Sequence, residues 1–500
     1  MLSAPDRTIA FESHKTLYRA IEETIEAARR SVSWQLFSIS FDISPVDPLG
    51  VFDALTAVDG RNFYFEKPDH GEAIVAWDEA VTQMVTGGHR FQEAQAFVDR
   101  CRGRSHHFGV EIGDRGFCGP TFICNFPFLD SPQGQGPFSQ GTVTVPRWCY
   151  GHRPDRQGRL RGIFTAVRRI DPRTAPEPLC HEILQQLDRL RHGLPMGVPW
   201  RGGRAGIVVP PLRSVAPVPV ALLRGETFEA AVAAALEDIQ RQRLRKVVLA
   251  HALDLELGRD LGLDPAVGHP AALLGNLRDR YPNCYSFALG DGQGRTFLGA
   301  SPERLVRLDQ TGPSGPRLYT EALAGSAPRG TTPQEDRTIG DRLLRSPKEL
   351  YEHALVADFI VGCLQDLGAT VDRPPHPQLH KLANIQHLHA PIAGHLKHPL
   401  DPLAAVAALH PTPAVAGTPR DAAIAAIARY EAFDRGPYAA PLGWIDSQGN
   451  AEFAVGIRCA LLDGDRARLY GGAGIVAGST PQRERAEIQL KLQALLAALV

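Results

Sequence analysis

Three short turns in the C-terminal half constrain the fold of this chain most strongly. Residues 290–294 (GDGQG), 446–449 (DSQG) and 463–465 (DGD) are rich in glycine and aspartate, and each lies between two strand-like apolar runs. This pattern is typical of β-hairpins. Because consecutive hairpins join neighbouring antiparallel strands, the series favours an antiparallel sheet over a doubly wound parallel one.

Length and composition limit the class of protein. A chain of 500 residues is longer than one ordinary domain, so we expect two domains or one large α/β body. The 54 basic and 55 acidic residues leave no excess charge for nucleic acid, and no apolar run is long enough to span a membrane. The eight cysteines form no C-x-x-C pair and no signal peptide is seen, which indicates reduced thiols in a cytoplasmic protein.

A stretch rich in proline, glycine and valine divides the chain. We interpret residues 201–222 as a linker between an N-terminal α/β half (residues 1–200), which contributes to the sheets, and a catalytic region (residues 223–500). The N-terminal half shows no catalytic constellation. Its expected helices span residues 14–30, 91–102 and 178–192, and its expected strands span 32–43, 61–66, 108–112, 121–126 and 162–170. Ordinary loop and core roles are expected for four residues that lack metal-site spacing, namely His106, His107, Cys118 and Cys124.

The end of the chain combines glycines with a charged helix. Residues 471–474 (GGAG) follow an alternating run and predict a glycine-rich turn before a helix that begins at Thr480 and Pro481. Residues 472–477 match the dinucleotide pattern G-x-G-x-x-A, but the return strand and acidic residue of a Rossmann unit are missing. Two interpretations stay open: a bend where backbone N–H groups approach an anionic ligand, or a plain tight turn.

Charged residues recur at the ends of other predicted elements. Lys246 begins a strand over residues 246–257 and shares its face with small residues, so it either faces a ligand or guards the strand end. Pro302 ends another strand and would fix the direction of Glu303.

Two predicted helices each carry an E-x-x-E pattern. Glu349 belongs to a capping box opened by Ser346, whereas Glu352, one turn later on the same face, has no such role. On the last helix Glu484, Glu487 and Lys491 share one face. Since neither helix supplies the E-x-x-H of a di-iron bundle, a single hard cation held by carboxylates is the better interpretation.

Seven motifs, in this order, resemble those of the chorismate-utilising enzymes, the family of isochorismate, salicylate, anthranilate and aminodeoxychorismate synthases. They are KVVLAH from Lys246, GASPERL around Glu303, ALAGS at residues 322–326, ELYEHALV around Glu352, HPTPAVAG from His410, IRCA at Arg458, and GGAGIVAGSTP before Glu487. The resemblance is dense from residue 227 onward and looser in the N-terminal half. It implies an α/β (α+β) fold in which two antiparallel sheets pack together with helices outside.

Three positions resemble the isochorismate synthases within this family. Water-adding members carry lysine where ammonia-adding ones carry glutamine, and this chain has Lys246. Ala324 stands where aminodeoxychorismate synthases have a nucleophilic lysine, and Ala414 stands where salicylate and anthranilate synthases tend to have threonine. The resemblance therefore implies conversion of chorismate to isochorismate. Salicylate synthase and the ammonia-using anthranilate synthase component I are the alternatives.

The resemblance also implies a role for each site residue. Lys246 is the expected base for water entering at C2, and Glu303 the expected acid for the hydroxyl leaving C4, so the lysine needs a lowered pKa and the glutamate a raised one. Mg²⁺ is the expected cofactor, held by Glu352 and Glu487, with Glu349 and Glu484 linked through water. The residues expected to bind substrate are Gly325, Ser326, His387, Ala414, Tyr438, Arg458, Gly472, Gly474 and Lys491.

Two positions depart from the family pattern. His251 stands where many relatives have arginine, and Ala390 where threonine or serine is usual, and either change would alter substrate anchoring. Chorismate is the expected partner of a monomer that needs no nucleic acid, membrane or amidotransferase subunit. Neighbouring enzymes would direct the product to menaquinone, siderophore or salicylate synthesis. A non-catalytic chorismate-binding protein should have lost a catalytic or metal residue, and none is lost.

Overall fold

The structure is a computed structural model that describes residues 13–55, 60–111, 116–131, 136, 138–155, 157–193, 226–258, 269–312, 315–382 and 385–499. The expected linker, residues 201–222, lies outside the described residues.

The N-terminal half supplies seven of the strands. Its elements are α1 (His14–Ser31), β1 (Gln35–Ile43), α2 (Pro48–Leu55), β2 (Arg61–Lys67), η2 (Pro68–His70), β3 (Glu72–Val85), α3 (Arg90–Gly103), β4 (Ser105–Gly109), β5 (Phe122–Asn125), β6 (Gly141–Pro154), β7 (Leu160–Ile170), α4 (Pro176–Asp188) and a π-helical turn η3 (Arg189–Gly193).

The C-terminal half supplies the strands that carry the candidate site. Its elements are α5 (Glu226–Gln240), β8 (Lys246–Glu256), α7 (Pro270–Arg280), β9 (Tyr285–Asp291), β10 (Arg295–Ser301), β11 (Arg304–Asp309), β12 (Arg317–Pro328), α8 (Pro333–Leu344), α9 (Pro347–Asp366), β13 (Thr370–Asp372), β14 (Gln378–Lys381), β15 (Ile385–His395), α10 (Pro402–Leu409), β16 (Gly417–Thr418), α11 (Arg420–Tyr430), β17 (Pro441–Ile445), β18 (Ala451–Val455), β19 (Cys459–Asp463), β20 (Arg466–Val476) and α12 (Pro481–Leu499).

The strands form two arms that share β6. One edge of β6 pairs with β7 over residues 148–154 and with β5 over residues 142–144. The first arm runs β4-β1-β7-β6-β3-β2-β9-β10-β19-β20-β8-β16, and the second runs β6-β5-β17-β18-β11-β12-β15, with β13 and β14 paired to β15. Among the described pairings only β1 with β4 is parallel, so the predicted α/β class with antiparallel strands is confirmed. The two expected sheets are joined through β6 into one continuous 20-stranded sheet.

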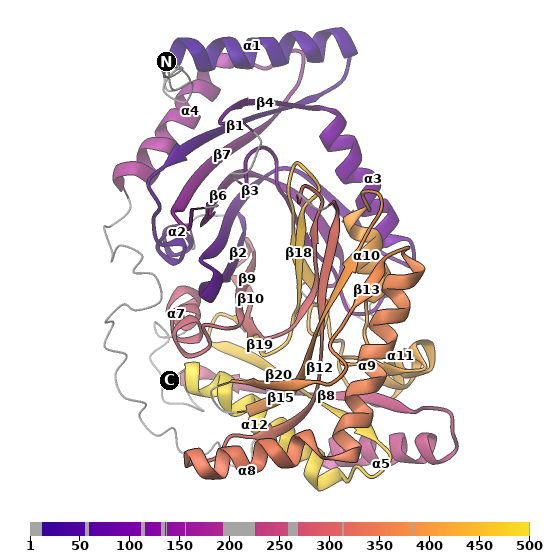
Figure 1. Ribbon diagram of the computed structural model, residues 1–500. Coiled ribbons are helices and arrows are strands. Elements are labelled where there is room, and N and C mark those ends of the chain that lie inside the picture. Colours follow the sequence, from indigo (N-terminus) through magenta and orange to yellow (C-terminus); the bar gives the residue numbers. More distant parts are fainter. Residues whose placement is uncertain are drawn as a thin grey trace.

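Helices cover the outside of both arms. Figure 1 shows α1 and α4 beside β1 and β7, and α9 and α10 along the second arm. At the end of the first arm, α11 packs on β8 and β16, and α5 and α12 lie under β8 and β20. One apolar core runs through both halves of the chain, for example where Phe65 of β2 lies opposite Phe287 of β9. The chain halves therefore share the sheet that supports the site. No helix in the described ranges is long and apolar enough to cross a membrane.

The three hairpins predicted from the turns are confirmed as β9–β10, β17–β18 and β19–β20. The strand predicted over residues 108–112 is wrong in position, because β4 ends at Gly109 and Ile112 lies outside the described residues. A Cβ on Gly109 would lie 2.2 Å from the Ser40 carbonyl oxygen, so the close approach of β4 to β1 at this position requires glycine. His106 and His107 belong to β4 and bond Gln35 and the Val110 carbonyl.

The glycine-rich turn predicted at residues 471–474 is also wrong. β20 continues through these glycines to Val476 and pairs with β8 at every position, with Gly471 opposite His251 and Gly474 opposite Val248. The open choice between a ligand-binding bend and a tight turn is thus replaced by a third arrangement, in which the glycines are part of a strand. Side chains of the candidate active site require the space that these glycines leave.

Candidate active site

A cavity lies between the two arms, where β8 and β20 face β12 and β15. It is lined by residues of these strands, of α9 and α12, and of the loops before β11, β16, β17 and β19. A second cavity adjoins it, and the two share Ser326 and Glu487. Nearly all the residues predicted from the sequence line these two cavities, namely Glu303, Gly325, Ser326, Glu349, Glu352, His387, Ala414, Tyr438, Arg458, Gly472, Gly474, Glu484, Glu487 and Lys491.

Lys246 of β8 is not among the residues that line the first cavity, but it contacts Glu352, which is. Its side chain is 1% exposed, and its Nζ lies 2.9 Å from Glu352 Oε1 on α9. A charge that guards a strand end would face water, so this alternative does not describe Lys246. A buried lysine that contacts a carboxylate of the cavity wall is instead a candidate for proton transfer in the cavity.

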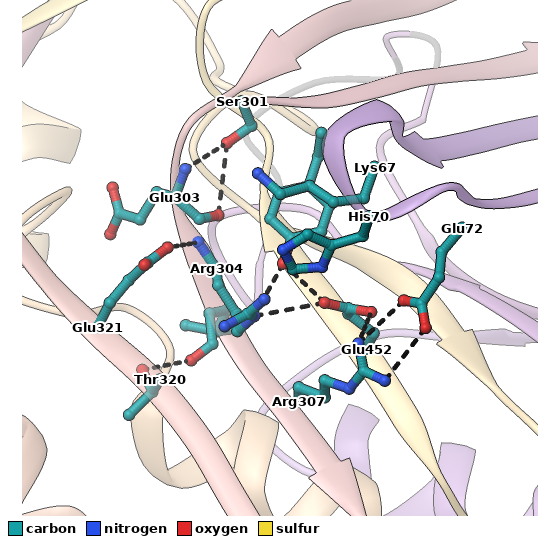
Figure 2. A network of polar contacts seen from close by, with 12 residues as sticks. Lys67, His70, Glu72, Ser301, Glu303, Arg304, Arg307, Thr320, Glu321 and Glu452 are labelled. Atoms are coloured by element: carbon teal, nitrogen blue, oxygen red, sulfur yellow. Dashed lines mark hydrogen bonds and ion pairs between the residues drawn. The ribbon is translucent and has the colours of Figure 1, made fainter. Parts of the chain in front are cut away.

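Glu303 lies between β10 and β11 and is held by the side chain of Ser301. The Ser301 hydroxyl accepts from the Glu303 N–H at 3.2 Å and donates to the Glu303 carbonyl at 3.4 Å, as Figure 2 shows. Burial and the nearby carboxylate of Glu321, opposed by Lys246 and Lys491, together raise the pKa of Glu303 to about 8. Glu303 is therefore a protonated acid at neutral pH.

Three side chains at the cavity form a hydrogen-bonded row, which runs from Arg458 through His387 to Ser326. Arg458 Nη2 lies 3.1 Å from His387 Nε2, and His387 Nδ1 lies 2.9 Å from Ser326 Oγ. Because a guanidinium can only donate, Nε2 accepts and Nδ1 carries the imidazole proton. Burial and the Arg458 charge both lower the pKa of His387 well below its usual range, so the ring is neutral. The row can bind a substrate carboxylate through the remaining Arg458 donors.

The backbone of Arg458 is in the left-handed region, with φ at 52°. This conformation is uncommon for a residue that has a Cβ, and such residues gather at functional sites. It turns the chain between β18 and β19 and directs the guanidinium to the row with His387.

Four glutamates from α9 and α12 meet three lysines. Lys491 Nζ lies 2.7 Å from Glu487 Oε1, Lys246 holds Glu352, and Lys348 lies 3.4 Å from Glu484 and 3.7 Å from Glu349. Sequence reasoning did not single out Lys348, although it stands next to Glu349. Burial raises the pKa of Glu349 and of Glu484, and nearby carboxylates add to the rise.

The predicted capping role of Glu349 holds only in part. Its N–H donates to Ser346 Oγ at 3.4 Å, but its carboxylate accepts from the Ser326 N–H on β12 at 3.3 Å. No bond back to the cap is formed, because the side chain turns toward the cavity. Gly325, at φ 77°, brings β12 close to this carboxylate.

The donor set fits a hard divalent cation, because carboxylate oxygens are the ligands that Mg²⁺ prefers. Among the described residues, no three of these glutamates place carboxylate oxygens within 4.8 Å of one another. Each glutamate lies beside a lysine instead. Four carboxylates against three ammonium groups leave an excess of one negative charge. Glu352, Glu487, Glu349 and Glu484 are the residues that would hold the ion.

The glycines of β20 leave room for these side chains. A Cβ on Gly472 would lie 2.7 Å from the Tyr438 hydroxyl, and a Cβ on Gly474 would lie 2.5 Å from Glu352 Oε1. The Gly472 carbonyl accepts from Lys491 Nζ at 2.8 Å. One wall of the cavity is therefore a bare strand, the part of β20 at Gly472 and Gly474 that carries no side chains.

The two departures from the family pattern lie apart from the cavities. His251 packs against Phe228 with ring centroids 6.1 Å apart, and Ala390 is buried on β15 opposite Ala322. Neither residue lines the walls described above.

The cationic side chains of Arg458 and Lys491 suit a small anionic ligand in this cavity, and comparison with known proteins gives the family. The sequence model of the chorismate binding enzymes matches residues 22–500, so the chain belongs to this family. It is 31% identical to the isochorismate synthase MenF of Bacillus subtilis, over 97% of this chain and 98% of that protein. It is 33% identical to the salicylate biosynthesis isochorismate synthase of Pseudomonas aeruginosa, over 97% and 93%.

A solved structure supports the same assignment. The menaquinone-specific isochorismate synthase MenF of Escherichia coli is similar in fold, with a TM-score of 0.68 and 26% identity, over 96% of this chain and 100% of that chain.

Proposed function

We propose that this protein is an isochorismate synthase that depends on Mg²⁺. The observation that carries the proposal is a protonated glutamate, Glu303, that lines the cavity, together with a buried lysine, Lys246, that contacts Glu352 of the same cavity. The full-length relatives named isochorismate synthases support the same reaction. The enzyme would work in the cytoplasm, as its eight free cysteines suggest, and as a monomer without an amidotransferase subunit.

The proposed reaction moves a hydroxyl from C4 to C2 of the ring. Lys246 accepts a proton from water as the water oxygen bonds to C2. The ring double bonds shift, the C4–O bond breaks, and Glu303 gives its proton to the leaving hydroxyl, which departs as water. One water enters and one leaves, so the product is an isomer of chorismate. For Lys246 this role requires the neutral amine, so the proton of its ion pair with Glu352 must leave before water is activated.

The remaining residues would orient the substrate. Arg458 and Lys491 would bind carboxylate, His387 would fix Arg458, and Tyr438 and Ala414 would shape the wall. A bound Mg²⁺ would supply positive charge beside the ring carboxylate. The bare strand at Gly472 and Gly474 would let the ring lie close to Lys246.

The alternatives differ in the product. An ammonia-using synthase would form anthranilate, but Lys246 stands where such enzymes are expected to carry glutamine. A salicylate synthase would release pyruvate and salicylate, but Ala414 stands where it is expected to carry threonine.

The experiment is to incubate the purified protein with chorismate and Mg²⁺ and to separate the products by chromatography. We expect isochorismate alone, and the same products when ammonium salts are added. Salicylate without free isochorismate, or anthranilate with ammonium, would contradict the proposal in favour of the corresponding alternative.

A further inference from the structure

We propose that Glu321 is a positioning residue that fixes the proton donor Glu303 and keeps it protonated, with His389 as its support. This inference rests on the proposed function, in which Glu303 donates the proton to the leaving hydroxyl.

Glu321 lies on β12 and binds the peptide that follows Glu303. Its Oε1 accepts from the Arg304 N–H at 2.7 Å, a contact drawn in Figure 2. The backbone ladder between β11 and β12 covers only residues 307–309 of β11, and a register shift separates Arg304 from Val306 in the pairing with β18. The carboxylate of Glu321 thus supplies an acceptor that the irregular strand end lacks.

Glu303 is consequently held on both sides of its own backbone. Ser301 bonds its N–H and carbonyl groups, and Glu321 bonds the next N–H along the chain. A proton donor must stay within hydrogen-bond reach of its target, and two fixed peptides limit how far the Glu303 side chain can move.

The second carboxylate oxygen of Glu321 also accepts a hydrogen bond. Its Oε2 lies 2.9 Å from His389 Nε2 on β15. Although burial acts to raise the pKa of Glu321, the bond from His389 and the charge of Arg304 bring it below its usual value. Glu321 is therefore ionised, and His389 Nε2 is the donor. His389 follows His387 by two residues, so β15 presents both imidazoles on one face.

Three charged groups act on Glu303 from three elements. Lys246 of β8 and Lys491 of α12 favour its ionised form, whereas Glu321 of β12 opposes it. Without the negative charge of Glu321, burial alone would have to offset two ammonium groups. Removing that charge therefore lowers the pKa of Glu303, and the proton donor is lost at a lower pH.

The test is Glu321→Gln, which keeps an oxygen that can accept from the Arg304 N–H but removes the charge. We expect the alkaline fall of turnover to move down by about one pH unit, so that turnover drops about fivefold at pH 8 and changes less than about twofold at pH 6. The dissociation constant of chorismate should stay within about threefold. Glu321→Asp, which keeps the charge, should restore the wild-type profile.

Glu72→Gln is the matched control, because Glu72 binds Arg307 in the same polar network and does not act on Glu303. Figure 2 shows it on the far side of Arg307. It should leave the pH profile unchanged. An alkaline limb in Glu321→Gln at the wild-type position would overturn the inference.

A readout that needs no turnover separates this inference from the proposed function. The infrared carboxyl band of Glu303, identified by its loss in Glu303→Gln, can be titrated in the wild-type protein and in Glu321→Gln. We expect the wild-type band to disappear near pH 8 and the variant band at lower pH. Wild-type titration near the ordinary pKa of glutamate would overturn the inference even if the variant does not fold. A protein that makes no isochorismate but shows the expected band shift would contradict only the proposed function.

Discussion

Gly474→Ala tests whether the site requires the bare strand of β20. A Cβ at this position would lie 2.5 Å from Glu352 Oε1 and 3.1 Å from Lys246 Cε, so it would push apart two groups that now form a 2.9 Å ion pair. Both atoms belong to the far ends of flexible side chains, so we expect the fold to lose only about 1–3 kcal/mol. A displacement of about 1 Å at a reacting group lowers a rate by about 10², and this is the loss of turnover that we expect.

The assay is the rate of isochorismate formation, with the free energy of unfolding measured in denaturant on the same samples. Gly362→Ala is the matched control, because Gly362 lies within α9 and an added Cβ there meets nothing within 4 Å. It should keep wild-type turnover and gain about 0.5–1 kcal/mol of stability. If Gly474→Ala keeps turnover within about threefold of wild type, the reasoning about the cavity wall is refuted.

Three further predictions concern the ion, the nucleophile and the pH. Turnover should stop in excess chelator and return with Mg²⁺, and Glu487→Gln should raise the Mg²⁺ concentration needed by about tenfold or more, because it removes an anionic ligand; full activity in chelator would contradict this. Ammonium salts should give no anthranilate by chromatography, since Lys246 stands where ammonia-adding members of the family are expected to carry glutamine. Turnover should fall as pH rises through about 8, because burial raises the pKa of Glu303 and its acid form is lost there; constant activity to pH 10 would count against Glu303 as the acid.

Local sequence was sufficient where the structural cause is local. The turns at residues 290–294 and 463–465 were predicted correctly because glycine and aspartate set the hairpin geometry within a few residues. Ser346 caps α9 for the same reason. By contrast, β6 was not predicted, since its Pro146 and Pro154 are typical of interrupted strands. Pro146 is tolerated because it lies opposite Glu79, next to a register shift in β3.

Other features depend on residues far apart in the chain. The glycines of β20 resemble a turn in the sequence, but the side chains that need their space come from β8, α9 and the loop that carries Tyr438. Glu321 and His389 are 68 residues apart and belong to no motif. The pairing of β12 with β15 brings His389 to Glu321, and the pairing of β11 with β12 brings Glu321 to the residue after Glu303. The family resemblance identified the residues at the cavity. The structure identifies the groups that bond to the backbone around them, such as Ser301 and Glu321.

The most direct measurement compares turnover with chorismate binding in Lys246→Ala and Glu303→Gln. Each variant removes one proton-transfer group, so turnover should fall by about 10²–10⁴, while the dissociation constant of chorismate should change by less than about threefold, because Arg458 and Lys491 remain. A Lys246→Ala enzyme that turns over within about threefold of wild type would contradict the account of Lys246 as the base.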